Sequence, residues 1–217
     1  MGKLAVFMTA VLLAVSGLAS AAGLQEGKDY AVLKPARPVE SRDKIEVTEF
    51  FWYGCPHCYK LDPTLTQWEK KLPKDVSFRR MPAVFPDEKG RPGRWAPLAQ
   101  VYFSLEAMGL LDKLHSQVFD AIHRDRVNLN DPKVLLDWMA SKGVDRQKFT
   151  DVMNSFTTQS KVLRAEQLSQ SYAFDGVPII YVDGRYTPIT AEAEDPAKLV
   201  AIVDQLIDKV RKERAKH

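Results

Sequence analysis

Cysteine is scarce in this 217-residue chain: there are only two, Cys55 and Cys58, and they stand three positions apart. No third thiol competes for pairing, so a disulfide within the chain closes a very short loop. Such a loop removes little entropy from the unfolded chain and is a poor way to stabilise a protein of this length. The scarcity therefore disfavours a purely structural disulfide and favours a chemical role for the pair.

The sequence also lacks a complete metal-ligand motif and a strong charge imbalance. There is no second Cys-x-x-Cys and no His-x-x-x-His, and His115, His123 and His217 are dispersed. The cysteine pair is therefore at most half of a zinc site. The 31 Lys and Arg against 28 Asp and Glu give a net charge of +3 with interspersed signs. This balance gives no reason to expect nucleic-acid binding.

Only the N-terminus carries a long apolar run. Lys3 precedes an uncharged stretch from Leu4 to Leu18, and Ala19-Ser20-Ala21 supplies the small-x-small pattern of a cleavage site. This layout predicts a secretory signal peptide at residues 1–21. A membrane anchor is the alternative, but the run is shorter than the ~20 residues a bilayer needs. We expect the mature protein to work outside the cytoplasm, where disulfides persist.

Hydrophobic patterns divide the rest of the chain into strands and helices. Between the first two strands, apolar residues at spacings of three or four predict a helix from Pro56 to Lys71. After the third, Asp183-Gly184 is a tight-hairpin signal that leads into a short strand at 185–187. Three runs rich in β-branched and aromatic residues are typical of the strands themselves: residues 45–52, 76–81 and 177–182.

The middle of the chain is helical, with apolar periodicity from about residue 95 to 173 and a loop rich in Pro and Gly before it. Asp195-Pro196 begins a last helix. This order resembles a thioredoxin fold, an α/β architecture. We expect three parts: 22–94 as its first portion, 95–173 as a helical domain inserted between the second and third core strands, and 174–217 as its second portion.

The cysteine motif stands where a strand meets a helix. Helix N–H groups and the helix dipole favour negative charge at that point, so Cys55 is the expected reactive thiolate. Cys58, one turn deeper, is the resolving partner. His57 lies between them and, when protonated, adds a second positive influence. A stabilised thiolate is a good leaving group, which makes the disulfide form a strong oxidant of other thiols.

Four segments carry a wider resemblance: Glu49-Phe50-Phe51, Cys55-Pro56-His57-Cys58-Tyr59, Gly176-Val177-Pro178 and Val182-Asp183-Gly184-Arg185-Tyr186. Together they resemble the DsbA family of periplasmic thiol:disulfide oxidoreductases in the thioredoxin superfamily. The likeness extends from about Gly27 to the C-terminus. It implies an oxidase that donates a Cys55–Cys58 disulfide to reduced cysteines of newly exported proteins. It implies reoxidation by a quinone-linked, DsbB-like inner-membrane protein.

The resemblance also assigns residues to the site. Cys55, Pro56, His57 and Cys58 form its catalytic motif, and we expect no metal or organic cofactor beyond the redox-active disulfide. We also expect a monomer.

A cis peptide between Val177 and Pro178, facing the cysteines, follows from the same resemblance. An extended substrate could then pair with the backbone of Val177, so both residues are candidates for substrate binding. An ordinary trans proline at a sheet edge is the alternative.

Glu49 is the unusual residue of its strand. Period-two counting places it on the apolar face with Ile45 and Val47. In the resembled family a buried Glu at this place affects proton transfer at the deeper cysteine, and a desolvated carboxyl could take the proton from Cys58. A solvent-facing carboxylate is the alternative. The family's basic neighbour corresponds to Arg80, which keeps its proton where a lysine could release one.

Other residues near the motif have simpler expectations. Asp62 can add charge one turn after Cys58, but we expect a solvated surface carboxylate. Tyr102 is expected to pack among the inserted helices. At most half of the aromatic residues around the motif should be exposed: Phe51, Trp52, Tyr53 and Tyr59.

Four other functions compete with an oxidase. A reductase or isomerase could use the same fold, although isomerases of this kind usually carry a dimerisation domain that no segment here would form. A thiol chaperone or a metallochaperone would bind partners without exchanging disulfides. Redox titration of the cysteine pair against glutathione separates these functions.

Overall fold

The computed structural model describes residues 23–41, 43–91, 93–189 and 195–216, so the expected signal peptide lies outside the described residues. One mixed sheet of five strands, in the order β1-β5-β4-β2-β3, organises this part of the chain. The strands are β1 (Tyr30–Val32), β2 (Ile45–Phe51), β3 (Val76–Pro82), β4 (Ile179–Val182) and β5 (Tyr186–Pro188).

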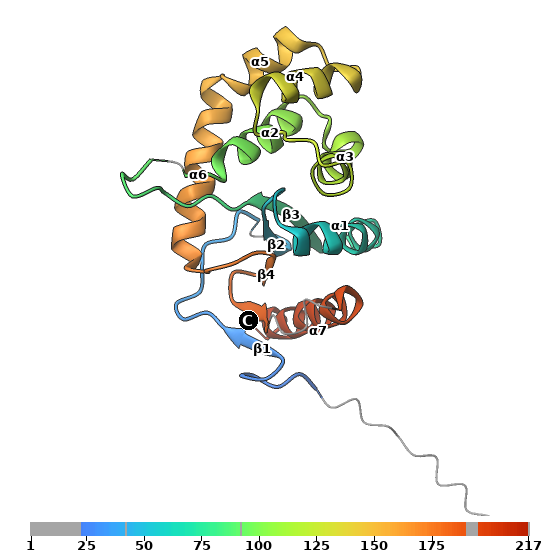
Figure 1. Cartoon of the computed structure of the whole chain (residues 1–217). Helices are drawn as coiled ribbons and strands as arrows, with labels where there is room; N and C mark the ends of the chain where they lie inside the picture. The colour runs from blue at the N-terminus through green and yellow to red at the C-terminus, as the bar shows by residue number, and fades with distance from the viewer. Residues whose placement is uncertain (1–22, 42, 92, 190–194, 217) are drawn as a thin grey trace, which may run out of the picture.

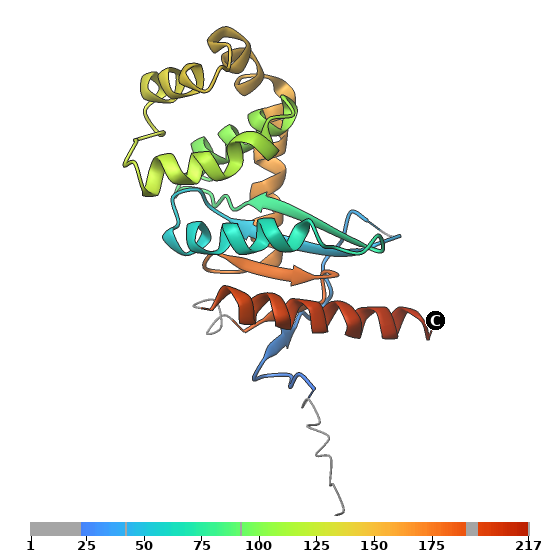
Figure 2. The ribbon, with the colours of Figure 1, turned by 90° about the vertical axis from the view of Figure 1, so that its right-hand side faces the viewer.

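Helices cover both faces of the sheet and one of its ends (Figures 1 and 2). The helix α6 lies on one face, α1 and α7 lie on the other, and α2 to α5 form a block at the end. All of α2 to α6 fall between β3 and β4, as the helical periodicity predicts. The helices are α1 (Pro56–Glu69), α2 (Ala96–Ala107), α3 (Leu111–His123), α4 (Pro132–Ser141), α5 (Arg146–Met153), α6 (Phe156–Tyr172) and α7 (Pro196–Arg214).

The strand β2 is the centre of the sheet. It pairs parallel with β3 and antiparallel with β4, and all seven of its residues are buried. Such burial needs cover on both faces. Ile45 and Val47 pack into an aliphatic core with α1 and α7. Phe50 instead packs on the α6 side, where its ring centroid lies 5.0 Å from that of Tyr172.

Local signals set most element boundaries. Asp183 and Gly184 both have positive φ (55° and 61°) in the turn between β4 and β5, as a type I′ hairpin requires. The Asp195 side chain accepts from two backbone N–H groups at the start of α7. β1 was not predicted, because its three residues are too few to show a strand pattern. That strand depends on antiparallel pairing with β5.

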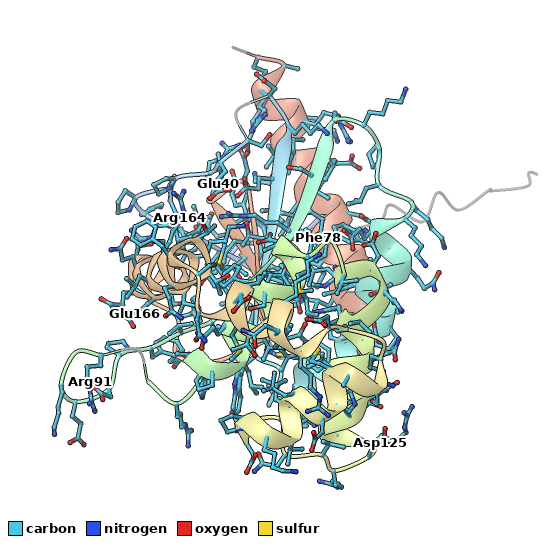
Figure 3. The ribbon with its side chains drawn as sticks, turned by 90° about the horizontal axis from the view of Figure 1, so that it is seen from above. Glu40, Phe78, Arg91, Asp125, Arg164 and Glu166 are labelled. Atoms are coloured by element: carbon cyan, nitrogen blue, oxygen red, sulfur yellow. The ribbon has the colours of Figure 1, made fainter. Side chains whose placement is uncertain are left out.

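A long projecting segment and the character of the helices complete the description of the fold. The segment between β3 and α2 projects from the domain, and Arg91 lies on it (Figure 3). Among the described helices, none combines the length and the apolar character that crossing a bilayer requires.

Candidate active site

Cys55 lies at the junction between β2 and α1. It is the N-cap residue of α1, with an extended backbone (φ −89°, ψ 120°), and Pro56 opens the helix. Its N–H donates to the Trp52 carbonyl at 2.9 Å, which closes a four-residue turn with Tyr53 and Gly54 at the centre. A Cβ on Gly54 would come within 2.4 Å of the Trp52 indole. The packing of that indole therefore demands glycine immediately before the cysteine.

The two thiols differ in acidity. Cys55 is 7% exposed and Cys58 is fully buried, and both are free thiols in this structure. The hydrogen bond from the Cys58 thiol, two backbone N–H groups and the charge of His57 lower the pKa of Cys55 to about 6, although burial opposes them. Burial raises the pKa of Cys58 well above its usual value. At neutral pH the thiolate is therefore on Cys55.

The Val177–Pro178 peptide bond is cis, as the resemblance implies. It faces the motif, since the Cys55 sulfur lies 3.3 Å from the Val177 carbonyl oxygen, which accepts a hydrogen bond from the thiol in its protonated form. Pro178 is buried and Val177 is half-buried, whereas His57 of the motif is exposed. The segment between α6 and β4 thus forms one side of the thiol site.

Glu49 is buried, with 3% of its surface exposed, so the solvent-facing alternative is wrong. The parallel register sets Arg80 of β3 directly beside it, and the Arg80 Nε lies 3.5 Å from the Glu49 Oε2. Burial raises the pKa of Glu49 to about 8, against the opposing charge of Arg80. Glu49 in turn raises the pKa of Cys58. The carboxyl and the deeper thiol are therefore electrostatically coupled.

Arg80 is shared among several groups of α1. Its Nη1 lies 2.7 Å from the Glu69 Oε2, and its Nη2 donates to the Thr66 hydroxyl at 3.1 Å and lies 3.7 Å from the Asp62 Oδ1. Its backbone carbonyl accepts from the Tyr102 hydroxyl at 3.1 Å. Tyr102 is buried as expected. One guanidinium thereby ties the strand to two turns of α1.

Asp62 is buried, with 3% exposed, and the prediction of a solvated carboxylate was wrong. Ser116 donates to its Oδ2 at 2.7 Å, and the His115 Nε2 lies 3.2 Å from its Oδ1. Although burial opposes ionisation, His115, Ser116 and Arg80 hold the pKa of Asp62 below its usual value. Asp62 lies four residues after Cys58, on the same buried stripe of α1.

Two histidines of α3 contact the turn before Cys55. The His115 Nδ1 lies 2.7 Å from the Tyr53 hydroxyl, and the His123 Nε2 lies 2.8 Å from the Tyr53 carbonyl oxygen. Burial lowers the pKa of His115, so its neutral ring accepts from the Tyr53 hydroxyl and keeps its Nε2–H toward Asp62.

In the sequence both histidines are only dispersed residues, and neither was predicted to contact the site. For His115 a signal existed, because it falls within the buried stripe of α3 beside Leu114 and Val118.

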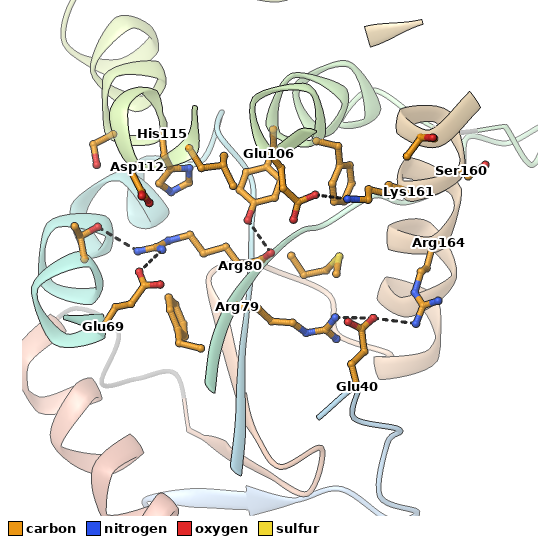
Figure 4. Close-up of a pocket in the computed structure, with 18 of the residues that line it drawn as sticks. Glu40, Glu69, Arg79, Arg80, Glu106, Asp112, His115, Ser160, Lys161 and Arg164 are labelled. Carbon is orange, nitrogen blue, oxygen red and sulfur yellow. Dashed lines mark hydrogen bonds and ion pairs between the residues drawn. The ribbon is translucent and has the colours of Figure 1, made fainter. Parts of the chain in front are cut away.

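An open groove of about 1310 Å³ runs along β3 between α1, α2, α3 and α6. Arg80, Glu69 and His115 line one side of it (Figure 4). The buried polar cluster, made up of Glu49, Asp62, Arg80 and His115, therefore has a route to solvent. Ion pairs cross the other side: Glu40 lies 2.9 Å from both Arg79 and Arg164, and Lys161 lies 2.6 Å from Glu106.

The aromatic residues around the motif divide as expected. Phe51 and Tyr53 are 1% exposed, whereas Trp52 and Tyr59 are half-buried. Trp52 stacks on Trp95, with ring centroids 4.7 Å apart. The Trp52 indole lies over Gly54, so it gives the reactive turn an apolar neighbour. In the described part of the chain, no group of three His, Cys, Asp or Glu side chains is arranged to hold a metal.

Known proteins are similar to this chain in both sequence and fold. A family model described as "DSBA-like thioredoxin domain" matches residues 46–203. The thiol:disulfide interchange protein DsbA of Pseudomonas aeruginosa is 40% identical over 185 residues, 85% of each chain. That of Azotobacter vinelandii is 39% identical over 192 residues, 88% of this chain and 87% of its own.

Solved structures agree with these matches. The crystal structure of Pseudomonas aeruginosa DsbA has a TM-score of 0.79 at 40% identity and covers 88% of this chain and 96% of its own. The oxidoreductase NmDsbA1 of N. meningitidis has a TM-score of 0.77 at 31% identity, over 89% and 97%. The expected thioredoxin fold with an inserted helical domain is thereby confirmed.

Proposed function

Since the chain belongs to the DsbA-like thioredoxin family and is a thiol:disulfide oxidoreductase that acts on substrate thiols, we propose that Cys55 is its reactive sulfur and Cys58 its resolving sulfur. The observation that carries this assignment is the split in acidity between them. The pKa of Cys55 falls to about 6 while burial raises that of Cys58. A stabilised Cys55 thiolate favours the reduced pair, so the disulfide form readily oxidises other thiols.

The reaction passes two electrons from the substrate to the pair. A substrate thiolate attacks the Cys55 sulfur of the Cys55–Cys58 disulfide, and Cys58 leaves as a thiolate that takes up a proton. A second substrate thiolate then attacks the substrate sulfur of the mixed disulfide. The substrate disulfide forms, and Cys55 leaves as the stabilised thiolate. The chemistry is carried by sulfur alone and needs no metal or organic cofactor.

Glu49 is the proposed proton partner of Cys58. A pKa of about 8 keeps Glu49 mostly protonated at neutral pH, so it can give a proton to the leaving Cys58 thiolate and take one back on reoxidation. Arg80 beside it tunes this carboxyl by charge, because a guanidinium does not release its proton at working pH.

Substrate docking is assigned to Val177 and Pro178. The Val177 carbonyl lies 3.3 Å from the reactive sulfur, so an extended peptide that pairs with this backbone brings its cysteine to Cys55. The partners that fit are exported chains with free thiols. We place the mature protein in the periplasm as a monomer, reoxidised there by a quinone-linked, DsbB-like membrane protein.

Redox titration against glutathione tests the proposal. We expect the wild-type pair to become reduced under mildly reducing buffer, with a Cys55 thiolate titrating near pH 6 in ultraviolet absorbance. The matched control is Cys58→Ala, which should form stable mixed disulfides through Cys55. A pair that stays oxidised in strongly reducing buffer would contradict the oxidase function.

His57→Ser tests the exposed residue of the motif. Its loss removes a charge that favours the Cys55 thiolate, so the pKa of Cys55 should rise and the variant should be a weaker oxidant. The thiolate absorbance profile and the glutathione equilibrium measure both effects. A profile identical to that of the wild type would remove His57 from the mechanism.

A further inference from the structure

The turn that presents Cys55 is held at two points by one helix of the inserted domain. Tyr53 is its first central residue. The His115 ring contacts the Tyr53 hydroxyl at 2.7 Å, and the His123 ring contacts the Tyr53 carbonyl oxygen at 2.8 Å. The two histidines lie eight residues apart on α3, close to two helical turns, so both face the same side. A side chain and a backbone group of one residue are thus fixed from one helix.

The carbonyl contact matters because of the glycine that follows. Gly54 does not have the positive φ that a type II turn requires at this position. Glycine nevertheless reaches that conformation without steric cost. A type II turn would differ from the present turn mainly by rotation of the central Tyr53–Gly54 peptide. The His123 Nε2–H donates to the carbonyl of that same peptide and holds it in its present orientation.

A second set of contacts fixes the first turn of α1 to the same helix. Tyr59 stacks on His123, with ring centroids 4.9 Å apart and an interplanar angle of 11°. Its hydroxyl donates to the Asp120 Oδ1 at 2.9 Å. The residues on both sides of the cysteine pair are therefore held by α3.

We propose that His115 and His123 are positioning residues through which the inserted helical domain sets the redox equilibrium of the cysteine pair, by fixing the Tyr53–Gly54 peptide. The inference rests on the proposed role of Cys55 as the reactive thiolate. That thiolate gains from N–H groups of His57 and Cys58, which reach it only when the turn sets Cys55 at the helix start.

The contacts of His115 and His123 with Tyr53, called the clamp from here on, act unequally on the two redox forms. In the disulfide form a covalent bond to Cys58 holds Cys55 against α1, whatever the state of the turn. In the reduced form only non-covalent contacts hold it. Loss of the clamp should therefore disfavour the reduced form more than the oxidised one, and the protein should become a weaker oxidant.

The test uses His123→Phe in the mature full-length protein. Phenylalanine keeps a ring against Tyr59 but has no donor for the Tyr53 carbonyl. Loss of one hydrogen bond should shift the glutathione equilibrium toward the disulfide form by about twofold to tenfold and raise the pKa of Cys55. His123→Gln, which can donate to the same carbonyl, should restore most of the wild-type value.

Gln117→Leu is the matched control. The Gln117 amide also donates from α3 to a backbone carbonyl, but that carbonyl belongs to Lys113 of the same helix. This variant should leave the equilibrium unchanged. Unfolding of each variant in both redox forms gives the second readout, and His123→Phe should lose more stability when reduced.

Two results would overturn the clamp: equal stability loss in both forms with an unchanged equilibrium, or a glutamine variant that behaves like the phenylalanine variant. Either result leaves the proposed function standing if wild-type Cys55 titrates near pH 6. A wild-type thiol that titrates at its ordinary pKa would instead overturn the role of Cys55 itself.

Discussion

Two buried carboxyl groups lie near Arg80, one on the strand β2 and one on the helix α1, and they behave oppositely. Glu49 on β2 and Asp62 on α1 are both 3% exposed, and Arg80 lies 3.5 Å from the first and 3.7 Å from the second. Yet the pKa of Glu49 rises to about 8 while that of Asp62 falls below its usual value.

Neighbouring polar groups explain the difference. Asp62 receives a hydrogen bond from Ser116 and faces the His115 ring, whereas burial dominates at Glu49 and only the charge of Arg80 opposes it. A shared cation therefore does not decide the ionisation of a buried carboxyl, because direct hydrogen bonds do. Glu49 on the strand therefore keeps its proton at neutral pH, and Asp62 on the helix keeps a negative charge.

Arg80→Met should affect both buried carboxyl groups, Glu49 and Asp62, because Arg80 lies near each of them. It leaves Glu49, Asp62 and Glu69 around a site without its cation, and removing one partner from a buried ion pair costs about 3–5 kcal/mol. Urea unfolding at pH 8 measures the loss. Arg80→Lys, which keeps a charge, should lose clearly less. A loss of under about 1 kcal/mol in the methionine variant would show that the cluster is not organised by this charge.

Glu49→Gln should remove the ionisable carboxyl of β2 and leave Asp62 of α1 unchanged. The folded-state pKa of Glu49 is about 8, above its usual 4.5, so between these values the folded protein binds more protons than the unfolded chain. Wild-type stability should therefore fall as pH rises through this window, by up to about 1.4 kcal/mol per pH unit. The variant lacks this term and should be more stable at pH 8, by on the order of 3 kcal/mol.

Unfolding of wild type and Glu49→Gln from pH 5 to pH 9 provides the measurement. The stability difference between the two should grow with pH. A difference that is flat across the window would mean that Glu49 ionises normally in the folded protein.

Asp62→Asn should give the smallest effect and the opposite sign of pH dependence. The pKa of Asp62 is lowered on folding, so its stabilisation is present above the unfolded-state pKa and is lost as pH falls through the folded-state value. We expect a loss of about 1–3 kcal/mol at pH 7 that shrinks toward pH 3. Glu88→Gln, an exposed loop carboxylate, is the control. A loss at pH 3 as large as at pH 7 would point to packing instead of charge.

The thiol half of the site was largely predictable from sequence. The strand pattern ending before Gly54 and the helix pattern from Pro56 place Cys55 at a helix N-terminus, and the structure has it as the N-cap of α1. Period-two counting likewise put Glu49 on the buried face. Both inferences rely on short-range periodicity, which a single sequence records.

The contact between Asp62 of α1 and His115 of α3 was not predicted, because these residues meet only in the folded chain. Asp62 and His115 are 53 positions apart, and each alone reads as an ordinary surface or core residue. Their contact depends on how α3 of the inserted block lies against α1. The buried stripes of both helices hold these positions, so helical phase was the available signal, but it does not reveal which stripes face each other.

The contact between Cys55 and Val177 has a consequence for the order in which the molecule assembles. The two residues are separated by 122 positions, and the whole helical block is synthesised between them. β2 can pair with β3 early, but its other edge waits for β4. Contacts between such distant segments form slowly because a long loop must close first. A partly synthesised chain therefore carries its cysteines without the Val177–Pro178 segment that faces them, and the thiol site is complete only once the last fifth of the protein has joined the sheet.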